Sequence, residues 1–129
     1  MPVKLKVIRA SDFLNLDADG EYNFESSKEL LVQIALAKKP PADFDVLLDL
    51  RDARFNLSTT EVWYLAAELE SHREAFREKL AILISSQTSV NQVEFFDLCA
   101  TNRGFSVDVF LNFEDAIDWL FPPENISSE

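Results

Sequence analysis

The sequence predicts a single α/β domain: a mixed, mainly parallel sheet with an antiparallel N-terminal strand. Two segments, residues 44–50 and 80–84, are apolar in the middle or throughout, as expected of strands covered on both faces. Each is followed by a segment with apolar residues at helical spacing. The chain has 129 residues, the length of one ordinary domain, and contains only two glycines, so most of it should be regular structure.

The expected element order is β-β-α-β-α-β-α-β-α. Apolar residues alternate with lysines over residues 3–7, which is the period of a half-exposed strand. Residues 17–20 are predicted to form a turn in which Gly20 takes a positive φ. A short second strand over residues 21–25 should follow, giving an antiparallel pair with a long connection.

Two of the predicted helices begin with capping-box patterns. Ser26 and Glu29 would cap the first, which two prolines at residues 40–41 should end. Ser58 and Glu61 repeat the pattern for the second helix. Its core-facing apolar stripe is predicted to consist of Val62, Leu65, Ala66, Leu69 and Phe76.

The C-terminal half is expected to add two more helices and one strand. A polar loop at residues 85–89 should cap the third helix, and Gly104 suits the position just after its end. A strand with one wetter face follows at residues 105–109, and Asn112 should cap the closing helix. The domain is thus predicted to span residues 1–121, with a flexible tail at 122–129.

Charge and composition argue against several classes of partner. The chain has 23 acidic and 12 basic residues, a formal net charge of −11, and would be repelled by phosphate backbones and anionic membrane surfaces. No apolar run approaches the ~20 residues of a membrane span, and no signal peptide is visible. A single cysteine, Cys99, excludes an intramolecular disulfide. We therefore expect a cytoplasmic protein that neither binds nucleic acid nor inserts into membranes.

Four charged residues follow the first buried strand: Asp49, Arg51, Asp52 and Arg54. In open α/β sheets, ligands gather beyond the carboxyl ends of the strands, so these side chains are candidates for a ligand-facing end. Local ion pairs are the favoured interpretation, because the sequence offers no convergent catalytic set and no glycine loop to cradle a phosphate. We expect a protein that is not an enzyme.

Residues 15–23 approach the spacing of a calcium-binding loop. The twelfth position would be Ser26, however, where such a loop needs a bidentate glutamate, and the flanks resemble strands rather than helices. The single histidine, His72, has no metal-ligating partner at suitable spacing. We therefore expect no metal site and no cofactor.

Several segments together resemble the STAS domain, the fold of bacterial anti-anti-sigma factors, and most closely its SpoIIAA-like relatives. Residues 48–60 run in step with the family's strand, its Phe-x-Asp-Ser-Ser-Gly loop and its helix start. Residues 80–86 are similar to the next strand and residues 95–98 to a later helix. The sequence Glu-Asp-Ala-Ile-Asp-Trp-Leu at 114–120 is similar to a Glu-Ala-x-x-Trp-Leu ending.

The resemblance implies a regulatory module that binds a protein partner, such as a kinase or an anti-sigma-like protein. Ser58 falls on the family's phosphorylated serine and Thr59 on the second serine of that motif, while Leu57 stands in place of its Asp and Thr60 in place of its Gly. A phosphate at Ser58 would also suit a helix N-terminus, although Ser58 and Glu61 are sufficient as an unmodified cap. The partner-binding candidates are Asn56, Leu57, Thr60 and Val62.

Two alternatives remain open. The many phenylalanines could line a pocket for a small apolar ligand or lipid, since related topologies include lipid-binding domains, although these side chains could equally fill the core. Half-exposed edge strands also leave room for a homodimer.

Overall fold

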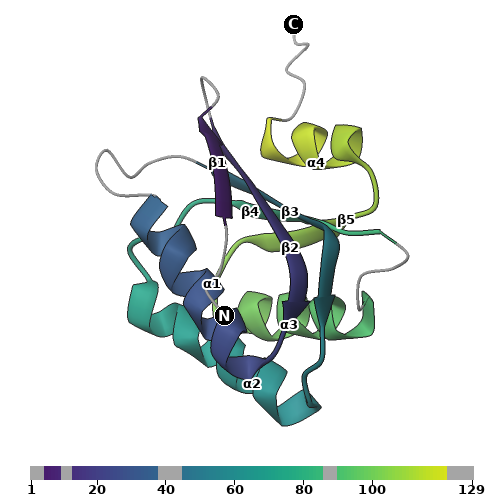
Figure 1. The fold of residues 1–129 in the computed structure, drawn as a ribbon. Helices are drawn as coiled ribbons and strands as arrows, with labels where there is room; N and C mark the ends of the chain where they lie inside the picture. The colour runs from purple at the N-terminus through teal and green to yellow at the C-terminus, as the bar shows by residue number, and fades with distance from the viewer. Residues whose placement is uncertain (1–4, 10–12, 38–44, 86–89, 122–129) are drawn as a thin grey trace, which may run out of the picture.

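A computed structural model describes residues 5–9, 13–37, 45–85 and 90–121. Five strands in these ranges form one sheet in the order β1-β2-β3-β4-β5 (Figure 1). The strands are β1 (Leu5–Arg9), β2 (Phe13–Tyr22), β3 (Asp45–Phe55), β4 (Leu80–Leu83) and β5 (Val107–Phe110). The helices are α1 (Phe24–Ala37), α2 (Thr59–Glu68), α3 (Val90–Asn102) and α4 (Phe113–Leu120), and a 3₁₀ turn, η1 (Leu69–His72), continues α2.

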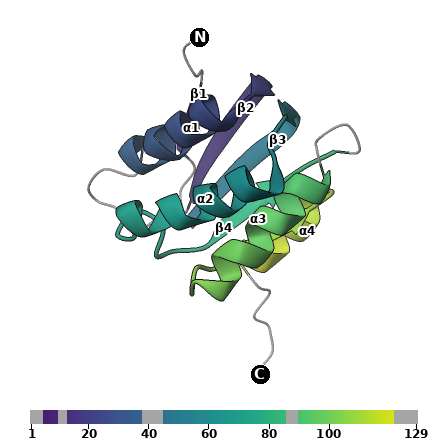
Figure 2. The same cartoon turned by 90° about the horizontal axis from the view of Figure 1, so that it is seen from below.

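The sheet is mixed and mainly parallel. β1 runs antiparallel to β2, while β2, β3, β4 and β5 pair in parallel. The three crossover connections all advance in the same direction along the sheet. Because such crossovers are right-handed almost without exception, their helices should share one face. Figures 1 and 2 show α1, α2 and α3 together on one face and α4 on the other.

The two faces of the sheet bury two separate apolar clusters. In the central strand β3, Val46 and Leu48 point into the larger cluster, beneath α1, α2 and α3, and Leu47 points into the smaller one. Ala116 and Leu120 of α4 complete the smaller cluster. This double covering explains why the middle of β3 and all of β4 are continuously apolar, as the sequence predicted.

The turn predicted at residues 17–20 does not exist, because these residues lie inside β2. Gly20 does have the expected positive φ, 91°, but within a strand. The pairing advances two residues from Asp17 to Asp19 on β2 while it advances three from Asp49 to Asp52 on β3, which is a β-bulge. Pairing with β3, and with β1 at Asp17 and Ala18, therefore overrides the local turn preference of this polar segment.

The first helix begins earlier than predicted, at Phe24, where the sequence pattern suggested a strand. Its cap is formed by Asn23 and Ser26 rather than by Ser26 and Glu29. The Ser26 amide donates to Oδ1 of Asn23 at 2.9 Å, and the Asn23 amide donates to Oγ of Ser26 at 2.9 Å. Asparagine is among the strongest N-cap residues, so the reciprocal cap forms three residues upstream.

Three other local predictions are confirmed. Ser58 caps α2, Asn112 caps α4, and Gly104 has a φ of 92° just after α3. The prolines at 40–41, most of the polar loop at 85–89 and the tail at 122–129 lie outside the described residues.

Candidate functional site

The connection from β3 to α2 presents three consecutive hydroxyl side chains at a helix tip. Ser58 is the N-cap, with φ −76° and ψ 163°, and Thr59 and Thr60 open the helix. The Glu61 amide donates to Oγ of Ser58 at 3.1 Å, and the Ser58 amide donates to Oε1 of Glu61 at 3.0 Å. All three hydroxyl residues are exposed, so Ser58 both caps the helix and faces solvent.

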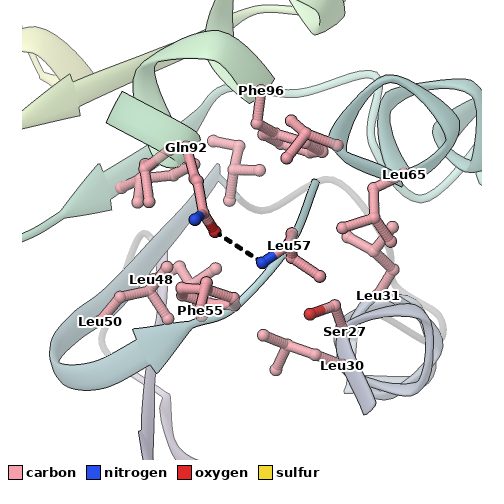
Figure 3. A pocket seen from close by; sticks show the side chains of 14 residues that line it. Ser27, Leu30, Leu31, Leu48, Leu50, Phe55, Leu57, Leu65, Gln92 and Phe96 are labelled. Carbon is pink, nitrogen blue, oxygen red and sulfur yellow. Dashed lines mark hydrogen bonds between the residues drawn. The ribbon is translucent and has the colours of Figure 1, made fainter. Parts of the chain in front are cut away.

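The residues just before Ser58 are attached to the body of the domain by backbone hydrogen bonds. The Asn56 amide donates to the carbonyl of Tyr22 at 3.0 Å, and the Leu57 amide donates to Oε1 of Gln92 in α3 at 3.1 Å. Figure 3 shows the Leu57 side chain pointing inward, toward Ser27 and Leu31 of α1. The connection is therefore held by its backbone amides on one side and by the half-buried, apolar side chain of Leu57 on the other.

Leu57 points into a cavity of about 60 Å³ between the sheet and helices α1, α2 and α3 (Figure 3). The lining residues are Ser27, Leu30, Leu31, Leu48, Leu50, Phe55, Leu57, Val62, Leu65, Leu80, Ile82, Gln92, Val93 and Phe96. Only Ser27 and Gln92 among them carry polar side-chain atoms. The Ser27 side chain is 3% exposed, and its hydroxyl has no hydrogen-bond partner among the described residues.

Two of the four predicted partner-binding residues have side chains that point inward. Leu57 is half-buried and points into the cavity (Figure 3). Val62 is 1% exposed and lines the cavity, so its side chain cannot reach a docked protein. It lies four residues after the Ser58 cap, on the face of α2 that packs against the sheet. The core stripe predicted for this helix was right on this point, and the docking assignment of Val62 was wrong.

Two exposed aromatic residues of α2 had not been identified from the sequence. Trp63 is 47% exposed and Tyr64 is 52% exposed, and their rings meet edge to face at 5.4 Å. The guanidinium carbon of Arg103, at the end of α3, lies 5.0 Å from the centre of the Trp63 ring. The sequence did contain a signal for their exposure. Val62 belongs to the core-facing stripe of an amphipathic helix, so the next two residues, Trp63 and Tyr64, should point away from the core.

The four charged residues predicted beyond the end of β3 lie within it, because the strand continues to Phe55. Asp49 and Arg51 form a bidentate pair, with Nη2 to Oδ2 at 2.7 Å and Nε to Oδ1 at 3.0 Å, which confirms a local ion pair for these two. Burial tends to raise the pKa of Asp49, but the hydrogen bonds and charge of Arg51 outweigh it and hold that pKa below its usual value. Asp52 and Arg54 are exposed around a surface hollow.

Within the described ranges, no group of three or more His, Cys, Asp and Glu side chains is arranged to hold a metal ion. None of the helices described is both long and apolar enough to cross a membrane.

Several solved structures are similar to this one in fold, among them the following two. One is a protein of the DUF3478 family with a SpoIIAA-like fold from Shewanella loihica PV-4, at 20% identity and a TM-score of 0.59, with 92% of this chain and 93% of that chain covered. The other is the anti-sigma factor antagonist SpoIIAA in its unphosphorylated form, at 16% identity and a TM-score of 0.59, covering 96% of this chain and 100% of that one. No family model and no curated protein sequence matches the chain.

These likenesses confirm the predicted STAS or SpoIIAA-like fold. They extend over nearly the whole chain, so the fold assignment applies to β1 through α4 and not to a fragment. At such low identity they establish the fold alone, and the function must be argued from the residues of this chain.

Proposed function

We propose that this chain is a non-enzymatic regulatory module that binds a protein partner through the N-terminal half of α2. The surface concerned, called here the α2 docking face, consists of Asn56, Ser58, Thr59, Thr60, Trp63 and Tyr64. The observation that carries the proposal is the half-exposed pair Trp63 and Tyr64 beside the exposed helix tip. Tryptophan and tyrosine are the residues most enriched among those that dominate binding energy at protein interfaces.

The helical geometry supports one continuous surface. Thr60, Trp63 and Tyr64 are spaced i, i+3 and i+4, so their side chains are neighbours on the same side of α2. The aromatic rings supply apolar area that a partner can bury, and the threonine and serine hydroxyls can form hydrogen bonds at its edge. This combination of an apolar centre and a polar margin is typical of a specific protein interface.

The net charge indicates the chemistry of the partner. The chain carries a formal charge of −11, and Glu61 lies at the helix tip itself. A partner with a basic margin around an apolar pocket would be attracted and oriented by this charge. The similarity in fold to SpoIIAA, an antagonist of an anti-sigma factor, supports a protein as the partner. An anti-sigma-like protein or a kinase is the class of partner that we propose.

The test is a comparison of binding affinities. A partner captured from the native host is purified, and its dissociation constant is measured by calorimetry against the wild-type chain, Trp63→Ala and Tyr64→Ala. Phe113→Ala is the matched control, because Phe113 is 43% exposed but belongs to α4 on the opposite face of the sheet. We expect each α2 variant to bind about tenfold or more weakly and the control to bind normally. Equal affinities for all four chains would refute the docking face.

Phosphorylation of Ser58 or Thr59 is the finer part of the proposal. A phosphate on Ser58 would gain from the helix dipole, but it would adjoin the Glu61 carboxylate, whose Oε1 accepts from the Ser58 amide at 3.0 Å. The two negative groups would compete for the same amides, so modification should displace Glu61 and alter the docking face. Intact mass spectrometry of protein from the native host tests this, together with partner binding by Ser58→Asp. An unmodified chain whose Ser58→Asp variant binds normally would exclude the switch.

A lipid carrier is poorly supported. Ligand pockets usually measure about 300–1,000 Å³, whereas the cavity under Leu57 measures about 60 Å³. A homodimer stays a prediction: β1 and β5 are the edge strands of the sheet, and sizing chromatography would decide whether either pairs with a second copy.

A further inference from the structure

One buried hydroxyl group beside the cavity, that of Ser27, has no hydrogen-bond partner among the described residues. The hydroxyl of Ser27 points from α1 toward Leu57 and the cavity (Figure 3). Its side chain is 3% exposed, and the oxygen has no hydrogen-bond partner among the residues described. A buried hydroxyl without a partner lowers the stability of a fold, so an alanine at this helical position would serve packing better. Packing therefore does not explain why a serine is found at this position.

The remaining lining defines what could bind there. Leucine, isoleucine, valine and phenylalanine side chains supply almost the whole wall, and no charged side chain contributes to it. An ionised ligand would lose its hydration without compensation, so the occupant must be neutral. A ligand with an apolar body and one hydrogen-bonding group would satisfy both the wall and Ser27.

Size adds a constraint that involves Leu57. An engineered apolar cavity of about 150 Å³ accommodates benzene, and the cavity here is smaller, about 60 Å³. A ring-sized molecule therefore fits only if a lining side chain withdraws. Leu57 is half-buried and belongs to the connection before α2, whereas Leu48, Leu80 and Ile82 are buried in the sheet. Leu57 can therefore move at less cost to the fold than these buried sheet residues.

We propose that this cavity is a binding site for a small neutral molecule with an apolar body and a single hydroxyl or carbonyl group, anchored by Ser27 and admitted by displacement of Leu57. Because Leu57 directly precedes the Ser58 cap, occupancy changes the conformation of the connection that carries the α2 docking face. This regulatory consequence rests on the proposed function, whereas binding itself does not.

Phenol is a suitable probe, and toluene is its counterpart without the hydroxyl. Methyl ¹H–¹³C spectra of the full chain are recorded during titration of each compound, for the wild type, Ser27→Ala and Leu57→Ala. Leu36→Ala is the control, since Leu36 is 50% exposed on α1. We expect saturable phenol shifts at the methyl groups of Leu30, Leu57 and Val93, with unchanged behaviour in the control.

The variants test separately the two roles in the proposed site: the anchoring of the ligand by Ser27 and its admission by Leu57. Ser27→Ala should lower the affinity for phenol about fivefold, the effect of losing one hydrogen bond, and leave the affinity for toluene unchanged. Leu57→Ala should increase the affinity for both compounds. If the alanine variant does not fold, Leu57→Val is used in its place. The absence of saturable shifts in the wild type and in both Leu57 variants would overturn the site, as would equal phenol affinity in Ser27→Ala and the wild type.

The outcome is independent of the docking experiment. Saturable cavity shifts together with equal partner affinity of Trp63→Ala and the wild type would refute docking and leave the ligand site standing. No saturable cavity shifts, together with weaker partner binding by Trp63→Ala, would refute the ligand site and support the docking face.

Discussion

The backbone amide of Leu57 donates a hydrogen bond to the side-chain Oε1 of Gln92 at 3.1 Å, across 35 positions of the sequence. This contact joins the connection before α2 to the first turn of α3 (Figure 3). It replaces the backbone pairing that Leu57 loses where β3 ends at Phe55. The position of the Ser58 cap, and with it the exposed face of α2, therefore depends on a side chain from another helix.

Replacing Gln92 by alanine should loosen this connection. The partly buried Leu57 amide would lose its acceptor, at a cost of about 1 kcal/mol in the free energy of unfolding. The change is measured as a lower urea midpoint at an unchanged slope, together with faster hydrogen exchange of the Leu57 amide.

Asn91→Ala is the control for Gln92→Ala, because Asn91 is exposed in the same turn of α3. It should leave the Leu57 amide protected. Equal exchange rates at Leu57 in the wild type and Gln92→Ala would show that the contact does not hold the connection.

The capping box of α2 should behave as one unit. Ser58→Ala and Glu61→Ala each remove one of two reciprocal hydrogen bonds, and loss of an N-cap costs about 1 kcal/mol. Because each side chain positions the other, the double variant should lose less stability than the sum of the single variants. Chemical denaturation of all four chains measures this coupling, and strict additivity would mean that the two bonds form independently.

Ser27→Ala should raise stability. The substitution removes a buried hydroxyl that has no partner among the described residues, and alanine is the better helix former. Relief of such a group is expected to add about 1 kcal/mol to the free energy of unfolding. Thermal and urea denaturation measure the gain, and a destabilised variant would indicate that the hydroxyl is bonded in solution.

Asp97 provides a pH-dependent prediction. Burial raises the pKa of its carboxyl group, and the negative charges of Asp108 and Glu94 add to this effect against the hydrogen bond from Thr101. A raised pKa in the folded state means that the stability contribution is complete below the unfolded pKa, about 3.9, and is lost as the pH rises through the folded pKa. Asp97→Asn, which mimics the neutral form, should therefore be more stable than the wild type at pH 7.

The difference between Asp97→Asn and the wild type should close on acidification below about pH 4. Denaturation midpoints from pH 3 to pH 8 measure it. The control is Asp118→Asn, a change at an exposed position of α4. A gap of constant size across this pH range would show that a change in packing, and not the charge of Asp97, causes the difference.

Features encoded by neighbouring residues could be predicted from the sequence. The caps at Ser58 and Asn112 and the positive φ at Gly104 depend on a few adjacent residues, and all three are present. The continuous apolar character of the middle of β3 and of all of β4 likewise indicates burial on both faces. These features were sufficient for the fold class.

Features that depend on distant partners could not be predicted. The segment at residues 17–20 has turn-forming composition but pairs with β3, and in its first half also with β1, and this pairing decides its conformation. The contact of Leu57 with Gln92, and the cavity around Ser27, join segments from α1, β3 and α3 that no local pattern connects. The error at Val62 and the omission of Trp63 and Tyr64 have another cause: the partner-binding residues were assigned from the family motif, although the helical spacing already placed Val62 in the core-facing stripe of α2.

Hydrogen exchange of the chain bound to its purified partner is the most direct test of the α2 docking face. If the α2 docking face binds the partner, protection should increase over residues 56–64 and remain unchanged in α4. Increased protection confined to α4 or β5, with residues 56–64 exchanging as in the free chain, would show that the partner binds elsewhere.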